Sequence, residues 1–178
     1  MSQGLMGNID QILRHLDETR SRLLDEVADL DADQFRRQPS PTEWSAAQVL
    51  DHLALVESQL SRHFRAMVEG KVPTTVRMVD RLRRLPPRLA AYRLIKAQNP
   101  RSVTPGDVQP KEQLLARLAQ SRVDLKALIA ETRERELSKL RFAHLALGGF
   151  NLYEWFAFIG YHEERHRKQI VEIKSKIL

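Results

Sequence analysis

The 178-residue chain carries 29 Lys and Arg residues against 23 Asp and Glu, a formal net charge of +6, and has no cysteine. The lack of cysteine excludes disulfide bonds, thiolate metal ligands and cysteine nucleophiles, so any thiol chemistry would need a thiol cosubstrate. The length fits a single domain over residues 1–178 with a substantial core. Because no long apolar run and no N-terminal signal pattern occur, we expect a cytoplasmic protein without a membrane segment.

The first half of the chain predicts two long helices separated by a loop. Asparagine at position 8 can cap a first helix, whose apolar residues recur at helical spacing up to residue 30. The Pro-containing run 38–42 then predicts a loop. A second helix is expected from Ser45 to about residue 69, because Ser45 followed by Gln48 forms a capping box.

The second half predicts a helical insertion followed by two more long helices. Residues 74–96 are expected to form one or two shorter helices, broken at the Pro-Pro pair. A third long helix is expected to open at Pro110. The last helix is expected to begin near Asn151, which can form a capping box with Glu154.

The overall pattern is that of an all-α protein. No segment shows the alternation typical of a half-buried strand, and neither a phosphate-binding Gly-rich loop nor a Gly-x-Ser-x-Gly motif is present. The sequence therefore does not favour a P-loop protein or an α/β-hydrolase. We predict an up-down-up-down four-helix bundle with a helical insertion between helices 2 and 3.

Basic residues gather in the predicted insertion. Such a segment could contact nucleic acid, an anionic membrane or an acidic cosubstrate. We favour a solvated connector whose arginine stems pack on the bundle. Nucleic acid is not expected as a partner, because Tyr92 is the only stacking aromatic residue nearby. The basic residues are Arg77, Arg81, Arg83, Arg84, Arg88, Arg93 and Lys96.

Two histidines in the last predicted helix are candidate metal ligands. His162 and His166 stand four residues apart within an apolar stripe, so their side chains lie roughly 5–6 Å apart on one helix face. The same string reads His-Glu-x-x-His, the signature of zincin metalloproteases. A zincin takes its third ligand from downstream, but residues 167–178 continue the same helix. We therefore expect a third ligand from upstream.

His52, at the edge of the apolar stripe of the second helix, is the upstream candidate. Three histidines suit a site that keeps open positions for water or substrate, and imidazoles accept zinc, nickel, cobalt, copper or iron. The alternative is that each is an ordinary hydrogen-bonded core histidine. His15 and His63 are expected to be structural or surface residues, and His144 to order the loop before the last helix.

The motifs around these histidines resemble those of the DinB/YfiT-like superfamily. They are Trp44-Ser-x-x-Gln-Val-Leu-x-His-Leu near the start and His162-x-x-x-His-x-x-Gln-Ile at the end, and the resemblance spans roughly residues 8–178. It implies an up-down bundle with one divalent transition metal, often zinc or nickel, held by the three matching histidines. It also implies a homodimer, and the family includes thiol-dependent transferases and isomerases.

These observations lead to a functional hypothesis with two alternatives. We expect a metal-dependent hydrolase or a thiol-dependent transferase or isomerase that acts on a small molecule. Glu163 is a weak candidate for a proton shuttle, since helical rotation turns it from the metal; Gln48, one turn before His52, is a better candidate for orienting a ligand. The first alternative is a non-catalytic stress-response binding protein with a structural or vestigial metal. The second, which we favour less, is a nucleic-acid-associated protein that acts through the arginines of residues 77–96.

Overall fold

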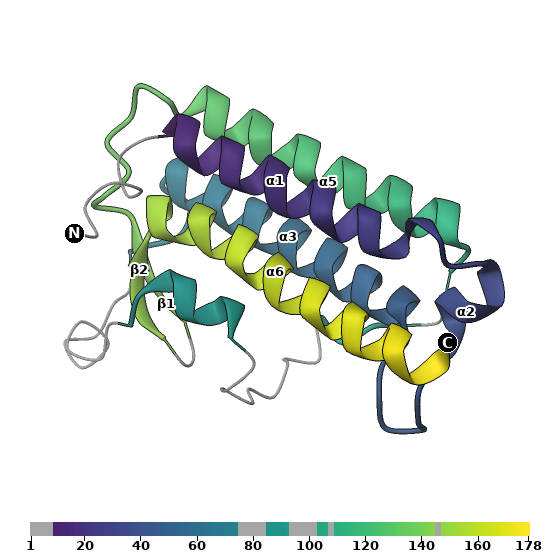
Figure 1. Cartoon of the computed structure of the whole chain (residues 1–178). Helices are drawn as coiled ribbons and strands as arrows, with labels where there is room; N and C mark the ends of the chain where they lie inside the picture. Colours follow the sequence, from purple (N-terminus) through teal and green to yellow (C-terminus); the bar gives the residue numbers. More distant parts are fainter. Residues whose placement is uncertain (1–8, 75–84, 93–102, 107–108, 145–146) are drawn as a thin grey trace.

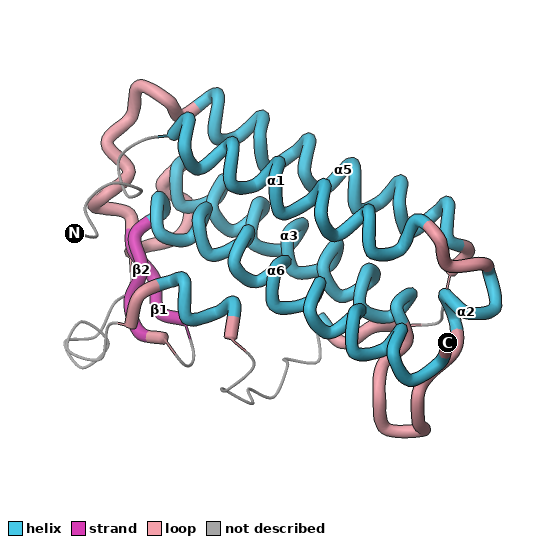
Figure 2. The backbone as a smooth tube through the Cα atoms, viewed as in Figure 1, coloured by secondary structure: helices cyan, strands magenta, loops and turns pink. Residues whose placement is uncertain are grey.

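The computed structural model describes residues 9–74, 85–92, 103–106, 109–144 and 147–178. Four long helices lie side by side as a bundle, with a short helix at one end and a β-hairpin at the other (Figure 1, Figure 2). The predicted four-helix bundle is confirmed. In chain order the elements are α1 (Ile9–Ala28), α2 (Ala32–Arg36), α3 (Ala46–Val68), the 3-10 helix η1 (Pro87–Ala91), α5 (Lys111–Glu131), β1 (Arg141–His144), β2 (Gly148–Asn151) and α6 (Leu152–Ile177).

Two capping boxes determine where α3 and α6 begin, as predicted. The Ser45 N–H donates to Gln48 Oε1 at 2.9 Å, and Ser45 Oγ accepts from the Gln48 N–H at 3.2 Å. Asn151 and Glu154 make the same reciprocal pair, with both distances at 2.9 Å. Each box satisfies backbone donors that a helix start leaves unpaired. The caps therefore fix the helical turns that carry the three candidate histidines.

The contacts between α1 and α6 show that these two helices run in the same direction. Thr19 Oγ1 donates to Glu163 at 2.8 Å, and further along α1 the Asp29 carboxylate accepts from Lys174 Nζ at 2.6 Å. Residue numbers rise together along the pair. The first and last helices of the bundle are therefore parallel neighbours.

The helices α3 and α5 are parallel as well. Asp51 pairs with Arg117 at 2.6 Å, and Arg65 pairs with Glu131 at 2.7 Å. Figure 1 shows this pair running opposite to α1 and α6. The order of directions is up-down-down-up, so the predicted up-down-up-down order is wrong. Two consecutive long helices that point the same way are joined by a crossover connection, so the end of α3 and the start of α5 lie at opposite ends of the bundle.

A two-stranded antiparallel hairpin precedes α6, although no strand was predicted. Phe142 of β1 is opposite Phe150 of β2, and Gly148 has a positive φ of 88° that suits the start of the second strand. The Phe142 ring stacks on Trp155 with a centroid separation of 4.1 Å. Strands of four residues are too short for alternation to stand out in the sequence, and these are held by aromatic packing on α6.

The predicted insertion contributes η1, which packs against α6. Lys168 Nζ donates to the Ala91 carbonyl at 3.3 Å, and Arg165 donates to the carbonyl of Tyr92. Of the basic residues singled out in the sequence, only Arg88 lies within the described residues, and its side chain is exposed. The role expected for the others concerns residues outside the described part of the chain.

The apolar core forms two clusters along the bundle axis. The cluster nearer the hairpin contains Phe64, Phe150 and Phe156, and the cluster nearer α2 contains Phe35 and Leu50. Both are filled by the inward faces of all four long helices. Among the described helices, none has the combination of length and apolar character that crossing a bilayer requires.

Candidate metal centre

The three candidate histidines converge between α3 and α6. Each of His52, His162 and His166 offers one ring nitrogen, and these atoms all lie within 4.8 Å of one another. The Nε2 atoms of His162 and His166 are 3.2 Å apart. Two ligands at 2.0–2.1 Å on a tetrahedral metal would be separated by about 3.4 Å, so this pair already has the spacing of a shared ion.

The ring of His52 is oriented by a backbone carbonyl. Its Nδ1 lies 2.7 Å from the carbonyl oxygen of Val103, which can only accept, so Nδ1 carries the proton and Nε2 the lone pair. The side chain is 1 % exposed, and Nε2 has no hydrogen-bond partner within the described residues. Metal-binding histidines are commonly held in this way, with the second nitrogen donating to a carbonyl.

The two histidines of α6 complete the donor set. His166 Nδ1 lies 2.8 Å from Gln169 Oε1, which places the proton on Nδ1 and directs Nε2 toward His162. Burial lowers the pKa of His162 well below its ordinary value, and the neighbouring His166 and His52 lower it further. Burial also lowers the pKa of His52. These rings are therefore held in the neutral form that binds metals.

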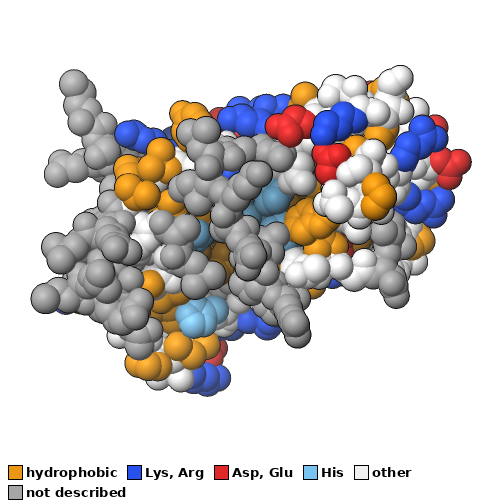
Figure 3. Space-filling view, turned by 90° about the horizontal axis from the view of Figure 1, so that it is seen from below, with side chains coloured by type: hydrophobic (Ala, Val, Ile, Leu, Met, Phe, Trp, Pro, Cys, Tyr) orange, Lys and Arg blue, Asp and Glu red, His pale blue; other side chains and the backbone are white. Residues whose placement is uncertain are grey.

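Aromatic side chains line the cluster on two sides. The Trp44 ring lies 5.1 Å from that of His52 and 6.4 Å from that of His166, and Phe158 stacks on His162 at 5.5 Å. Seen from below, one face of the molecule shows histidine side chains next to hydrophobic ones (Figure 3). The arrangement gives the three nitrogens an apolar surrounding in which their interactions with an ion are strengthened.

Glu163, a weak candidate for a proton shuttle, is directed into the bundle and pairs with residues of α1 and α5. The side chain is 2 % exposed and accepts from Arg20 Nε at 2.6 Å and from Arg122 Nη2 at 3.1 Å. Thr19 donates to it as well. A carboxylate held by two arginines inside the bundle does not fit a proton shuttle at the metal.

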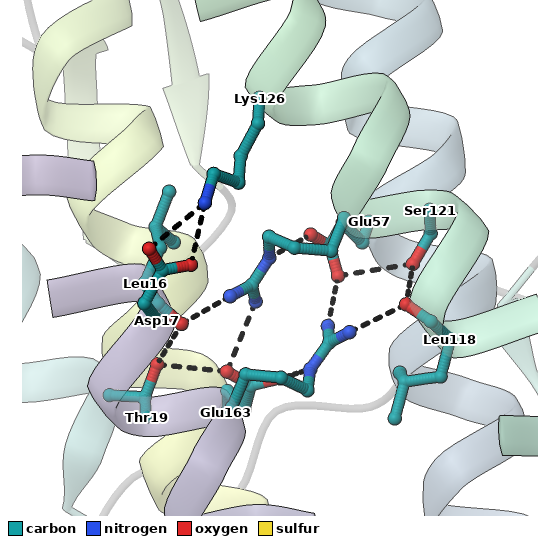
Figure 4. Close-up of polar contacts among 10 residues, drawn as sticks. Leu16, Asp17, Thr19, Glu57, Leu118, Ser121, Lys126 and Glu163 are labelled. Atoms are coloured by element: carbon teal, nitrogen blue, oxygen red, sulfur yellow. Dashed lines mark hydrogen bonds and ion pairs between the residues drawn. The ribbon is translucent and has the colours of Figure 1, made fainter. Parts of the chain in front are cut away.

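The arginines and glutamates form a closed ring to which each long helix contributes one residue (Figure 4). Arg20 of α1 and Arg122 of α5 each bridge Glu57 of α3 and Glu163 of α6, over distances of 2.6–3.1 Å. All four side chains are at most 10 % exposed. The sequence carried a signal for this layer, a charged residue inside the apolar stripe of every long helix, which our sequence analysis missed.

Gln48 does not orient His52 as predicted. Its side-chain oxygen accepts from the Ser45 backbone at 2.9 Å and from Gln38 Nε2 at 3.1 Å, so it belongs to the cap of α3. The group that orients His52 is the Val103 carbonyl. A backbone carbonyl on a distant connection has no side-chain signature, so sequence reasoning could not identify it.

The other histidines take the structural roles expected of them. His144 Nδ1 accepts from the Leu147 N–H at 3.2 Å, across the turn of the hairpin, and burial lowers its pKa to about 4. His15 and His63 each pack against an aromatic ring at a centroid distance of 4.5 Å. None of these three belongs to the histidine cluster.

The sequence match that goes with this geometry is extensive. A family model described as the DinB superfamily matches residues 15–170. The chain belongs to the DinB superfamily. The matched region contains all three clustered histidines and all four residues of the buried ring, so both features lie within the part of the chain that defines the DinB relationship.

The chain is also similar to individual proteins over most of its length. The uncharacterized protein YuaE of Bacillus subtilis (strain 168) is 28% identical over 161 residues, which cover 90% of this chain and 95% of YuaE. The crystal structure of TT2238, a four-helix bundle protein, has a TM-score of 0.60 at 22% identity and covers 93% of this chain and 99% of that one. YfiT from Bacillus subtilis, described as a probable metal-dependent hydrolase with an unusual four-helix bundle topology, has a TM-score of 0.60 at 15% identity, over 94% of this chain and 86% of YfiT.

Proposed function

We propose that His52, His162 and His166 hold one divalent transition metal, zinc or nickel, and that the protein uses it to act on a small molecule as a hydrolase or a thiol-dependent transferase or isomerase. The observation that carries the proposal is the buried Nε2 of His52, which has no partner among the described residues and lies beside two further imidazoles. Buried polar atoms are normally paired, so an ion is the partner that this atom fits.

The chemistry of the donor set agrees with a catalytic role. A metal on three imidazoles retains open positions, acts as a Lewis acid and lowers the pKa of a bound water or thiol. The protein fixes the tautomers of His52 and His166 and surrounds the site with Trp44 and Phe158. Because the chain has no cysteine, a reacting thiol would belong to a cosubstrate.

Metal content tests the first part of the proposal. Untagged protein purified without added metal should contain about one transition-metal ion per chain, and His166→Gln should lose the ion while keeping its helical circular dichroism. His63→Gln serves as the matched control, because this histidine lies outside the cluster, and it should keep the ion. Wild-type protein that takes up no metal, or a His166→Gln variant that still binds one equivalent, would contradict the proposal.

An open coordination position tests the second part. Cobalt-substituted protein should respond to a small thiol with a new thiolate charge-transfer band, and to a hydroxamate with a change in its visible spectrum. The ligand that binds then decides which activity is screened on the metal-loaded protein: thiol transfer if the thiol binds, hydrolysis if the hydroxamate binds. A cobalt spectrum that no added ligand changes would favour the alternative, a binding protein with a structural metal.

A further inference from the structure

The connection between α3 and α5 touches the candidate metal centre at two points. The Val103 carbonyl accepts from His52 Nδ1 at 2.7 Å, and the Gly106 N–H donates to Asp51 Oδ2 at 3.2 Å. Asp51 and His52 are consecutive residues of α3. Two adjacent side chains of one helix therefore hold the two ends of the same four-residue segment, 103–106.

The Asp51 carboxylate is itself fixed in place. The residue is 7 % exposed, and its second oxygen, Oδ1, accepts from Arg117 Nη1 of α5 at 2.6 Å. Oδ1 therefore binds α5, and Oδ2 binds the segment that carries Val103. A backbone carbonyl on a connection can hold a ligand only as firmly as the connection itself is held.

We propose that Asp51 is a positioning residue of the metal centre, which anchors Gly106 so that the Val103 carbonyl keeps His52 Nε2 directed at His162 and His166. The inference rests on the proposed metal-binding function and adds to it. Outer partners of this kind fix the tautomer and the ring orientation of a ligand, and losing one typically weakens metal affinity about 10–100-fold.

A purely structural role for Asp51 makes a different prediction. If the residue only joined α3 to α5, removing Arg117 would have the same effect as removing Asp51. Arg117→Met deletes the ion pair but leaves the Gly106 N–H···Oδ2 bond, so under our proposal it leaves metal affinity unchanged. Asp51→Asn keeps an oxygen that can accept from Gly106 and should restore most of what Asp51→Ala loses.

Metal affinity, measured by competition of zinc between the protein and a chelator, separates the two roles. Asp51→Ala should weaken zinc binding about tenfold or more, while Arg117→Met and Gly106→Ala remain within twofold of wild type. Gly106→Ala is the matched control on the connection, since a Cβ there would meet no atom within 4 Å. Equal losses in Asp51→Ala and Arg117→Met, or no loss in Asp51→Ala, would overturn the proposal.

The tautomer of His52 in metal-free protein provides a second readout that does not depend on metal binding. Imidazole ¹⁵N spectra of the wild type should show protonated Nδ1 and unprotonated Nε2, and Asp51→Ala should show a mixture. If Asp51→Ala does not fold, Gly106→Pro, which removes the donor from the connection, should give the same mixture. An unchanged tautomer in the folded variants would refute the positioning role. Wild-type protein that shows the predicted tautomers but takes up no added zinc would refute only the metal site.

Discussion

Burial lowers the pKa of histidines both inside and outside the proposed metal site. Desolvation is the main cause of the lowered pKa of His52 and His162 in the histidine cluster, and of His144 and His15 outside it. A low pKa alone therefore does not mark a ligand here. What distinguishes the clustered rings is the direction of their second nitrogens, set by the Val103 carbonyl for His52 and by Gln169 for His166.

The lowered pKa of His144, about 4, predicts how stability changes with pH. Between that value and the ordinary value of 6.5, the unfolded chain binds a proton that the folded chain does not, so the free energy of unfolding should fall as the pH drops through this window. His144→Asn keeps an acceptor for the Leu147 N–H but cannot titrate. As the pH falls, the free energy of unfolding of the wild type should therefore decrease relative to that of the variant, by up to about 1.4 kcal/mol per pH unit.

Urea denaturation of both proteins from pH 7 to pH 4 would measure this shift. The comparison cancels the other buried histidines, which titrate in both proteins. A stability difference that stays constant across the window would mean that His144 remains accessible to protons in the folded state.

The helices show which features can be read from local sequence and which cannot. The starts of α3 and α6 were predicted because Ser45 with Gln48 and Asn151 with Glu154 are capping boxes contained within four residues. The helix directions were predicted wrongly, because they depend on the long connection between α3 and α5 and not on local sequence. The histidine cluster was predicted from the spacing of its residues and from the resemblance to a known family. The role of Val103 could not be predicted, because it depends on that same connection.

The cap of α6 should make a measurable contribution to stability. Asn151→Ala removes the acceptor for the Glu154 N–H and should lower the free energy of unfolding by about 1 kcal/mol. Asn151→Asp is the matched control, since it keeps an acceptor at the same place and should remain near wild type. Chemical denaturation measures both, and equal loss in the two variants would show that the amide, not the cap, matters.

Across the whole molecule, a charged layer divides the apolar core. Along each long helix the residue of the buried ring (Arg20, Glu57, Arg122 or Glu163) lies between the residues of the two hydrophobic clusters. Two positive and two negative charges balance within the layer. Such a layer contributes little net stability compared with apolar packing, but each member becomes costly to lose.

Breaking this layer should destabilise the protein strongly. Glu163→Gln leaves two buried arginines opposite one carboxylate and should lower the free energy of unfolding by about 3–5 kcal/mol. The matched control is Asp17→Asn, which breaks the exposed pair with Lys126 and should cost less than about 1 kcal/mol. Thermal or urea unfolding of the two variants tests the contrast, and a Glu163→Gln variant as stable as Asp17→Asn would show that water reaches the ring.

A ring built from one residue per helix also bears on how the chain folds. A partly folded chain that lacks any one long helix would leave a buried charge without its partners, so incomplete assemblies are disfavoured and folding should be all-or-none. The pairing of Thr19 with Glu163, 144 residues apart, further implies slower folding than in bundles of sequential hairpins. Trp155 belongs to one core cluster and Trp44 packs on the other, so the fluorescence of single-tryptophan variants reports on each half. Both should lose structure at the midpoint seen by circular dichroism, because neither half of this protein can persist alone.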